Sequence, residues 1–227
     1  MKGETLRLAE ALTEERTWES EGITVLCASV SLPQLAGKSG RARRFNRYYR
    51  RFCRAYFSYC AQVLFPEAMA SCQAAMAVSA PWIVSRAALR HRVSYQDRDL
   101  LSIVCDARET CCGEAPFLLR RSEVWDLSTG LPLPIEEFFP PRRRCKAALL
   151  RFAREETRRR VDSGTAVFRE NWRSALRRTL NTRNFFLSPE GFCFFYPMFA
   201  LSGAAEGIVT FTMPYDAESG PFLPPQA

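Results

Sequence analysis

The spacing of apolar and polar residues predicts one clear helix in the first third of the chain. From about residue 39 to residue 65, large apolar residues recur in steps of three and four, which places them on one helix face. They are Phe45, Tyr49, Phe52, Tyr56, Tyr59 and Val63. We expect Pro66 to interrupt or end this helix, because proline lacks a backbone N–H. Residues 68 to 78 indicate a second, more apolar helix.

Patterns with a period of two predict strands before and after these helices. The three strands expected beyond Pro81 follow each other closely, which is typical of an antiparallel meander. The expected strands cover residues 22 to 32, 83 to 95, 100 to 105 and 117 to 127. Two later helices are expected over residues 142 to 161 and 172 to 180.

Residues 185 to 215 predict a strongly apolar hairpin that turns at Pro189-Glu190-Gly191. In its second strand, Phe192, Phe194 and Tyr196 share one face, and Cys193 and Phe195 share the other. Both faces are apolar, so we expect this hairpin to be central in a sheet that is covered by helices. The whole pattern predicts an α+β fold, in which an antiparallel sheet carries helices mainly on one face.

The 227 residues are enough for a substantial core, and we expect one domain over residues 21 to 215. Residues 1 to 20 are expected to be a lead-in, either a short amphipathic helix or disordered. Residues 216 to 227 contain three prolines and no periodicity, which predicts a disordered tail.

The start of the chain predicts no secretory segment, because Met1 and Lys2 are followed by polar residues. The longest weakly polar stretch, residues 68 to 84, is too broken by polar residues and Pro81 to span a bilayer. We therefore expect a cytoplasmic protein with no membrane contact. Nine cysteines without pairs at chelating distance favour buried thiols over a metal site or disulfides, and no cofactor is expected.

Positive charge is the strongest signal outside the predicted core. The chain has 32 Lys+Arg against 24 Asp+Glu, a net charge of +8, and residues 41 to 54 hold seven arginines and no acid. Such clustering favours an anionic partner, with nucleic acid as one alternative, although a solvated helix face has the same pattern. The candidate anion-binding residues are Arg44, Arg47, Arg51, Arg54, Arg142, Arg143 and Arg144.

The sequence contains no recognisable catalytic constellation, so we do not expect an enzyme. His91 is the single histidine, which excludes motifs with two histidine ligands, and its apolar strand neighbours favour a core role. Carboxylate pairs occur at Asp97/Asp99, Glu136/Glu137 and Glu155/Glu156. Glycoside hydrolysis needs two carboxylates that face each other across a cleft, which such spacing alone does not provide. A hydrolase that uses these acids stays open as a further alternative.

Three segments carry a resemblance to a known family. An aromatic strand, a glycine turn, a second aromatic strand, an Ala-x-Gly segment and a β-branched strand ending in Pro-Tyr follow each other at Phe186-Leu187, Gly191, Phe194, Tyr196, Ala205-Glu206-Gly207, Ile208, Val209 and Pro214-Tyr215. "VSLPQL" (30 to 35) with "RFNRYYRRF" (44 to 52), and "VWDLSTGLPLPIEEFF" (124 to 139), agree in order. Together they resemble the RsiV/PdaC-type domain, which occurs in the extracellular part of the RsiV anti-sigma factor and ahead of the catalytic domain of the peptidoglycan deacetylase PdaC.

The resemblance implies a non-catalytic binding or sensing module. In this family, the domain is associated with lysozyme recognition in the anti-sigma factor and with cell-wall glycan in the deacetylase. A net charge of +8 repels basic partners such as lysozymes, so an anionic wall polymer, an acidic protein or an unknown cytosolic ligand fits the charge better.

Overall fold

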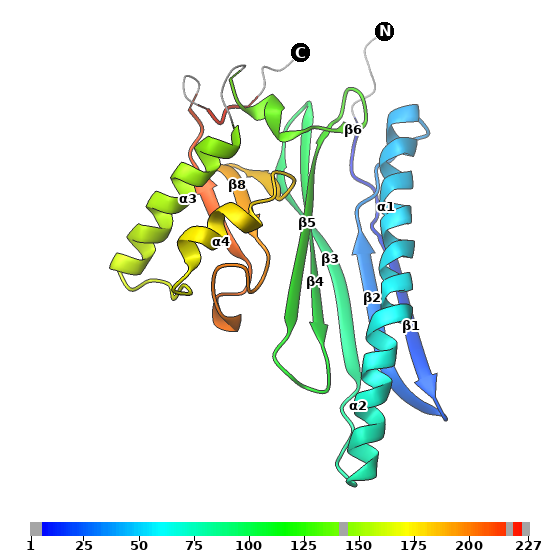
Figure 1. Ribbon diagram of the computed structural model, residues 1–227. Helices are drawn as coiled ribbons and strands as arrows, with labels where there is room; N and C mark the ends of the chain where they lie inside the picture. The colour runs from blue at the N-terminus through cyan, green and yellow to red at the C-terminus, as the bar shows by residue number, and fades with distance from the viewer. Residues whose placement is uncertain (1–5, 141–144, 217–219, 224–227) are drawn as a thin grey trace. The chain divides into compact units, whose positions relative to one another are not determined.

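The computed structural model describes residues 6–140, 145–216 and 220–223 (Figure 1). The strands are β1 (Leu12–Ser20), β2 (Ile23–Leu32), β3 (Ser85–Gln96), β4 (Leu100–Thr110), β5 (Phe117–Asp126), β6 (Leu131–Pro132), β7 (Phe185–Ser188), β8 (Gly191–Tyr196) and β9 (Val209–Met213). The helices are α1 (Gly40–Tyr59), α2 (Phe65–Ala77), α3 (Cys145–Asp162) and α4 (Trp172–Thr179), with the short helices η1 (Cys60–Leu64), η2 (Ile135–Phe138) and η3 (Ala204–Glu206).

The α+β class predicted from the sequence is confirmed. One sheet has the strand order β1-β2-β3-β4-β5-β6, and a second has the order β7-β8-β9. The chain divides into two compact units, unit 1 (Met1–His91 and Cys105–Leu118) and unit 2 (Arg92–Val104 and Leu119–Ala227). The single domain over residues 21 to 215 stays a prediction.

The expectation of a helix or disorder over residues 1 to 20 is wrong for its second half, which forms β1. This strand pairs antiparallel with β2 from Leu12↔Leu32 to Ser20↔Ile23. The two-residue loop between them, Glu21-Gly22, has positive φ at both positions, 51° and 77°. Two such residues form the tight turn whose twist matches a β-hairpin, so this turn closes β1 onto β2.

The long helical segment of unit 1 contains a change of helix type just before Pro66. α1 ends at Tyr59, η1 is a π-helical turn, and the Phe65 N–H donates to the Cys60 carbonyl five residues earlier. A proline ring clashes with the carbonyl four residues before it, and a wider turn relieves this clash. The helical path therefore continues through the proline into α2, as Figure 1 shows.

The predicted antiparallel sheet contains one parallel pair, β2 with β3, from Leu26↔Ser85 to Ser31↔Arg90. A parallel pair needs a long crossover, and the helical segment from α1 to α2 provides it. The predicted inner face is buried at Ser85, Ala87 and Leu89 of β3, whereas Ile83, which precedes the strand, is 54% exposed and Val93 is 38% exposed. His91 is half-buried, and its Nδ1 lies 2.9 Å from the Ser31 carbonyl oxygen.

Unit 2 contains the predicted apolar hairpin. β8 lies between β7 and β9 with all six of its residues buried, and the hairpin turns at Pro189-Glu190 as expected. Phe192, Phe194 and Tyr196 pack in one core cluster with residues of α3 and α4. On the other face, Cys193 and Phe195 pack against Val104 of β4. Helices therefore cover one face of this small sheet and a strand covers the other, which corrects the expected cover of helices.

A cation–π layer completes that second face. The Arg92 guanidinium lies 5.2 Å from the Phe186 ring centroid, and the Arg120 guanidinium lies 5.6 Å from that of Phe195. The aliphatic parts of such side chains can shield an apolar face while the charge stays solvated.

Candidate anion-binding surface on helix α1

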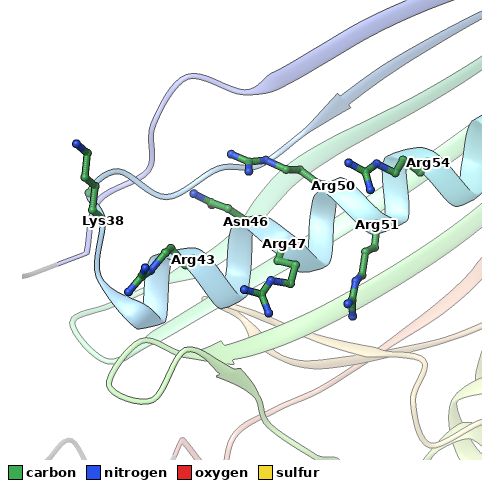
Figure 2. A pocket seen from close by; sticks show the side chains of 8 residues that line it. Lys38, Arg43, Asn46, Arg47, Arg50, Arg51 and Arg54 are labelled. Carbon is green, nitrogen blue, oxygen red and sulfur yellow. The ribbon is translucent and has the colours of Figure 1, made fainter.

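One exposed side of α1 carries a dense group of cations around a surface cavity of about 580 Å³ (Figure 2). We call this group the arginine face. It consists of six exposed residues, Lys38, Arg43, Arg47, Arg50, Arg51 and Arg54. Four of the arginines follow the helical steps 43, 47, 50 and 54, so they form a stripe about 16 Å long on one side of the helix.

The opposite side of α1 fixes the position of the arginine face. Phe45, Tyr49, Cys53 and Phe57 are at most 1% exposed, so the helix is held by its buried aromatic side. Asn46 joins the helix to the preceding loop, because its side chain donates to the Leu35 carbonyl at 2.9 Å and accepts from the Leu35 N–H at 2.8 Å. This pair of bonds holds the loop that carries Lys38 beside the first turns of the helix.

The charges of the arginine face are not neutralised by acids in the described part of the chain. None of its six cations forms an ion pair within the described part of the chain. The first turn of α1 contains no acid, so the positive end of the helix dipole adds to the arginine charges instead of being compensated. Like charges four residues apart destabilise a helix by about 0.2–0.5 kcal/mol per pair. This arrangement works against helix stability and produces a local positive potential.

The predicted candidate residues divide into three groups. Arg47, Arg51 and Arg54 belong to the arginine face, whereas Arg44 is exposed on α1 but does not line the cavity. Arg142, Arg143 and Arg144 lie outside the described residues. Sequence reasoning missed Lys38, Arg43 and Arg50, although the spacing of residues 43, 47, 50 and 54 was readable as one helix face.

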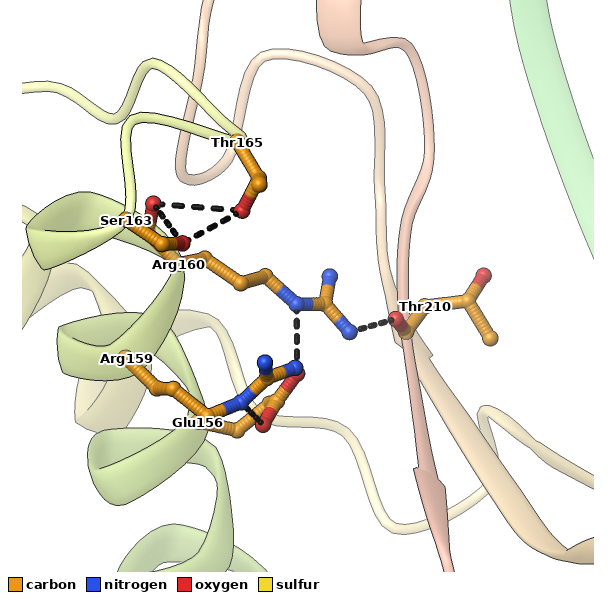
Figure 3. Close-up of polar contacts among 6 residues, drawn as sticks. All are labelled: Glu156, Arg159, Arg160, Ser163, Thr165 and Thr210. Atoms are coloured by element: carbon orange, nitrogen blue, oxygen red, sulfur yellow. Dashed lines mark hydrogen bonds and ion pairs between the residues drawn. The ribbon is translucent and has the colours of Figure 1, made fainter.

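Two of the three acid pairs have members with structural roles. Asp97 Oδ1 accepts from the backbone N–H groups of Asp99 and Leu100, which closes the turn between β3 and β4. Glu156 on α3 accepts from Arg159 at 2.7 and 2.8 Å and from Arg160 at 2.8 Å (Figure 3). Arg160 also donates to the Thr210 carbonyl, which joins α3 to β9. Glu136 and Glu137 are exposed on η2.

The cysteines form no disulfide, and all nine are free thiols. In the described residues, no group of three or more His, Cys, Asp or Glu side chains is placed to hold a metal ion.

The Glu156 cluster predicts a stability difference that depends on pH. The hydrogen bonds of Arg159, and after them those of Arg160, lower the pKa of Glu156 to about 2. Glu156→Gln should therefore lower the free energy of unfolding at pH 7 by about 1–2 kcal/mol, less than the shift implies because Arg159 is 70% exposed. Because the pKa of Glu156 is lower in the folded state than in the unfolded state, where it is about 4.3, the charged carboxylate stabilises the fold at pH values above about 4.3. This contribution is lost as the pH falls through the pKa of the folded state.

Urea denaturation of both proteins between pH 7 and pH 2 measures the effect, with Glu155→Gln as a matched control at an exposed neighbouring acid. If the difference in free energy of unfolding between the wild type and Glu156→Gln is as large at pH 2 as at pH 7, the charge of Glu156 is not its cause.

The comparison with protein families matches one segment in the second half of the chain. Residues 136–216 match the model of a family described as a protein of unknown function, DUF3298. This segment runs from η2 to β9 and contains the apolar hairpin. The arginine face lies outside it. No curated protein matches the chain in sequence.

Two crystal structures of DUF3298 proteins share the fold over nearly the whole chain. A member of the DUF3298 family from Bacteroides fragilis has a TM-score of 0.65 at 13% identity, covering 95% of this chain and 93% of its own. A DUF3298 family protein from Pseudomonas aeruginosa has a TM-score of 0.56 at 13% identity, covering 93% and 91%. Identity this low establishes the fold and nothing about ligands. Among the described residues, no helix is both long and apolar enough to cross a bilayer.

Proposed function

We propose that this chain is a non-catalytic binding module that takes an anionic polymer along the arginine face. The observation that carries the proposal is a stripe of exposed arginines on α1 that has no carboxylate partner among the residues the structure describes. Exposed cations without an acidic partner attract phosphate or carboxylate groups, and guanidinium groups bind these in bidentate geometry. The positive end of the helix dipole adds to this attraction only near Arg43, close to the start of α1. The resemblance to the RsiV/PdaC-type domain and the DUF3298 match over residues 136–216 are consistent with a binding role.

An anionic cell-wall polymer is the preferred class of ligand. The resemblance implies association with cell-wall glycan or lysozyme, and the net charge of +8 disfavours a basic protein such as lysozyme. Single-stranded nucleic acid is disfavoured because the cavity lining contains no aromatic side chain on which bases could stack. Duplex nucleic acid is the second candidate, since a regular row of cations can follow a phosphate backbone without stacking. The cytoplasmic location stays a prediction, and binding of a wall polymer would require export of the chain and would argue against that location.

We expect the change of Arg43, Arg47, Arg50 and Arg54 together to Gln to abolish binding of a poly(glycerol phosphate) wall polymer. The reason is that these four residues supply four of the six positive charges of the arginine face. The matched control changes Arg151, Arg154, Arg158 and Arg177 to Gln, which removes the same charge from exposed positions on α3 and α4. None of these four arginines lines the cavity of the arginine face.

Calorimetric titration of both variants and the wild type with the wall polymer, peptidoglycan fragments, lysozyme and a DNA duplex separates the ligand classes. If the wild type binds only the DNA duplex, and the variant with Arg43, Arg47, Arg50 and Arg54 changed to Gln does not, duplex nucleic acid is favoured as the ligand. Equal loss in both variants would assign the effect to net charge and not to the arginine face.

A further inference from the structure

Glu109 on β4 is a buried carboxylate that no cation in the described residues neutralises. It is 7% exposed, and its two oxygens accept from Tyr56 Oη at 3.5 Å and from Tyr59 Oη at 3.0 Å. Burial raises the pKa of Glu109 above its ordinary value, and the charge of Glu67 acts in the same direction. Two hydroxyl bonds leave half of the acceptor capacity of a carboxylate unused. Burial of such a group is costly unless a positive charge approaches it.

A cavity of about 290 Å³ in unit 1 gives access to this carboxylate. Its polar lining includes Glu67 and Glu114 besides Glu109, against the single cation Arg86. Its apolar lining includes Val63 and Phe117, which are 40% and 39% exposed. The volume is near the lower end of the range for sites that hold small molecules, about 300–1,000 Å³. An acidic recess with apolar sides is thus present in a chain whose net charge is +8.

The π-helical turn η1 contributes to the shape of this cavity. Val63 and Leu64 belong to η1, and Tyr59 directly precedes it. A π-helical turn carries one more residue per turn than an α-helix, which changes the direction of the side chains that follow, and such turns are frequent at functional sites. Pro66 explains why the turn exists, and its consequence is that apolar side chains and the Tyr59 hydroxyl line the same recess as Glu109.

We propose that this cavity binds an organic cation, with an ammonium or guanidinium group at Glu109 and its aliphatic stem against Val63 and Phe117. The carboxylate supplies the charge, the two exposed acids Glu67 and Glu114 attract the cation, and the apolar residues select a stem over a hydrated inorganic ion. The ligand is either a free aliphatic amine or a lysine or arginine side chain of a protein. The site goes beyond the proposed anion-binding function, and it lies outside residues 136–216.

Calorimetric titration with agmatine, and with an acetylated and amidated peptide that contains one lysine, tests the proposal on the full chain. The variant Glu109→Gln keeps the size of the side chain and removes its charge. Loss of a charge-assisted hydrogen bond should weaken binding about tenfold or more. The matched control is Glu19→Gln, an exposed acid of unit 1 on β1. It should bind as the wild type does.

A second variant protects the test against a folding defect in Glu109→Gln. Val63→Trp places a large ring at an exposed position in the cavity lining and leaves every carboxylate intact, so it should also weaken binding. Thermal melts by circular dichroism check that each variant is folded. The proposal is overturned if neither probe binds the wild type, or if a folded Glu109→Gln binds as tightly as the wild type does.

The two probes distinguish the sources of the cation. Binding of agmatine alone would indicate a free amine, and binding of the peptide would indicate a protein side chain; both support the site. The polymer assay separates this proposal from the proposed function, because Glu109→Gln should leave polymer binding unchanged. Conversely, the variant with Arg43, Arg47, Arg50 and Arg54 changed to Gln should bind agmatine as the wild type does.

Discussion

Replacing Phe194 by alanine is expected to lower the free energy of unfolding by about 3–5 kcal/mol, the usual cost of deleting a buried aromatic side chain. Phe194 is 1% exposed in the middle of β8. Its ring stacks on Phe211 at 5.3 Å and meets Tyr196 and Phe152 at 6.4 Å each. The variant would remove contacts with β9 and α3 at once, and the residues around it are too tightly packed to fill the cavity.

The matched control is Phe199→Ala in the same unit, at a ring that is 40% exposed and outside the core cluster of Phe194. Its expected effect is within about 0.5 kcal/mol, as for most surface changes. Urea denaturation followed by circular dichroism measures both variants. A cost for Phe194→Ala as small as that of the control would mean that the hairpin is not the core of unit 2.

The aromatic hairpin is the part of the fold that the sequence predicts best. Alternation in β8 assigned Phe194 and Cys193 to opposite faces, and the structure places them in different core clusters. Here the pattern is sufficient because a one-residue slip in register would reverse every side chain, so the two faces follow from periodicity alone. What covers each face depends on segments far away in the sequence. For this reason the strand residue Val104 on the second face was not foreseen.

Errors were made where a local turn decides the structure. The hairpin between β1 and β2 depends on positive φ at Glu21 and Gly22, and glutamate is not a typical residue for that conformation. The parallel pairing of β2 with β3 depends on a crossover of more than fifty residues, and the periodicity of each strand alone does not indicate its pairing partner.

The two candidate sites differ in how far the sequence predicts them. The arginine face needs only the period of one helix, so its central residues were found without a structure. The cavity at Glu109 combines residues from α1, η1, α2, β3 and β4, and single acids in a strand pattern give no signal. The one feature of the sequence that bears on this cavity is Pro66, which accounts for the π-helical turn.

Salt should weaken polyanion binding by the arginine face steeply. The four arginines of the stripe can each displace one counterion from a phosphate polymer, and the slope of log K against log salt is about −0.9 per phosphate for a B-form duplex. Four contacts therefore give a slope of about −3.6, and a rise from 50 to 200 mM salt should weaken duplex binding about 150-fold. A measured slope near zero would mean that binding does not depend on these charges.

Removal of the arginines one at a time tests which of them make contact. Each single change to Gln at Arg43, Arg47, Arg50 or Arg54 should reduce the slope by about 0.9, because one fewer counterion is released. A change of Arg154 to Gln should leave the slope unaltered, since Arg154 lies on α3 and does not line the cavity of the arginine face. Equal slopes in all five variants would show that the polymer follows the overall charge of the chain. A smaller slope of log K against log salt in each of the four α1 variants, but not in the Arg154 variant, would identify the arginine face as the contact. The reason is that all five variants have the same net charge.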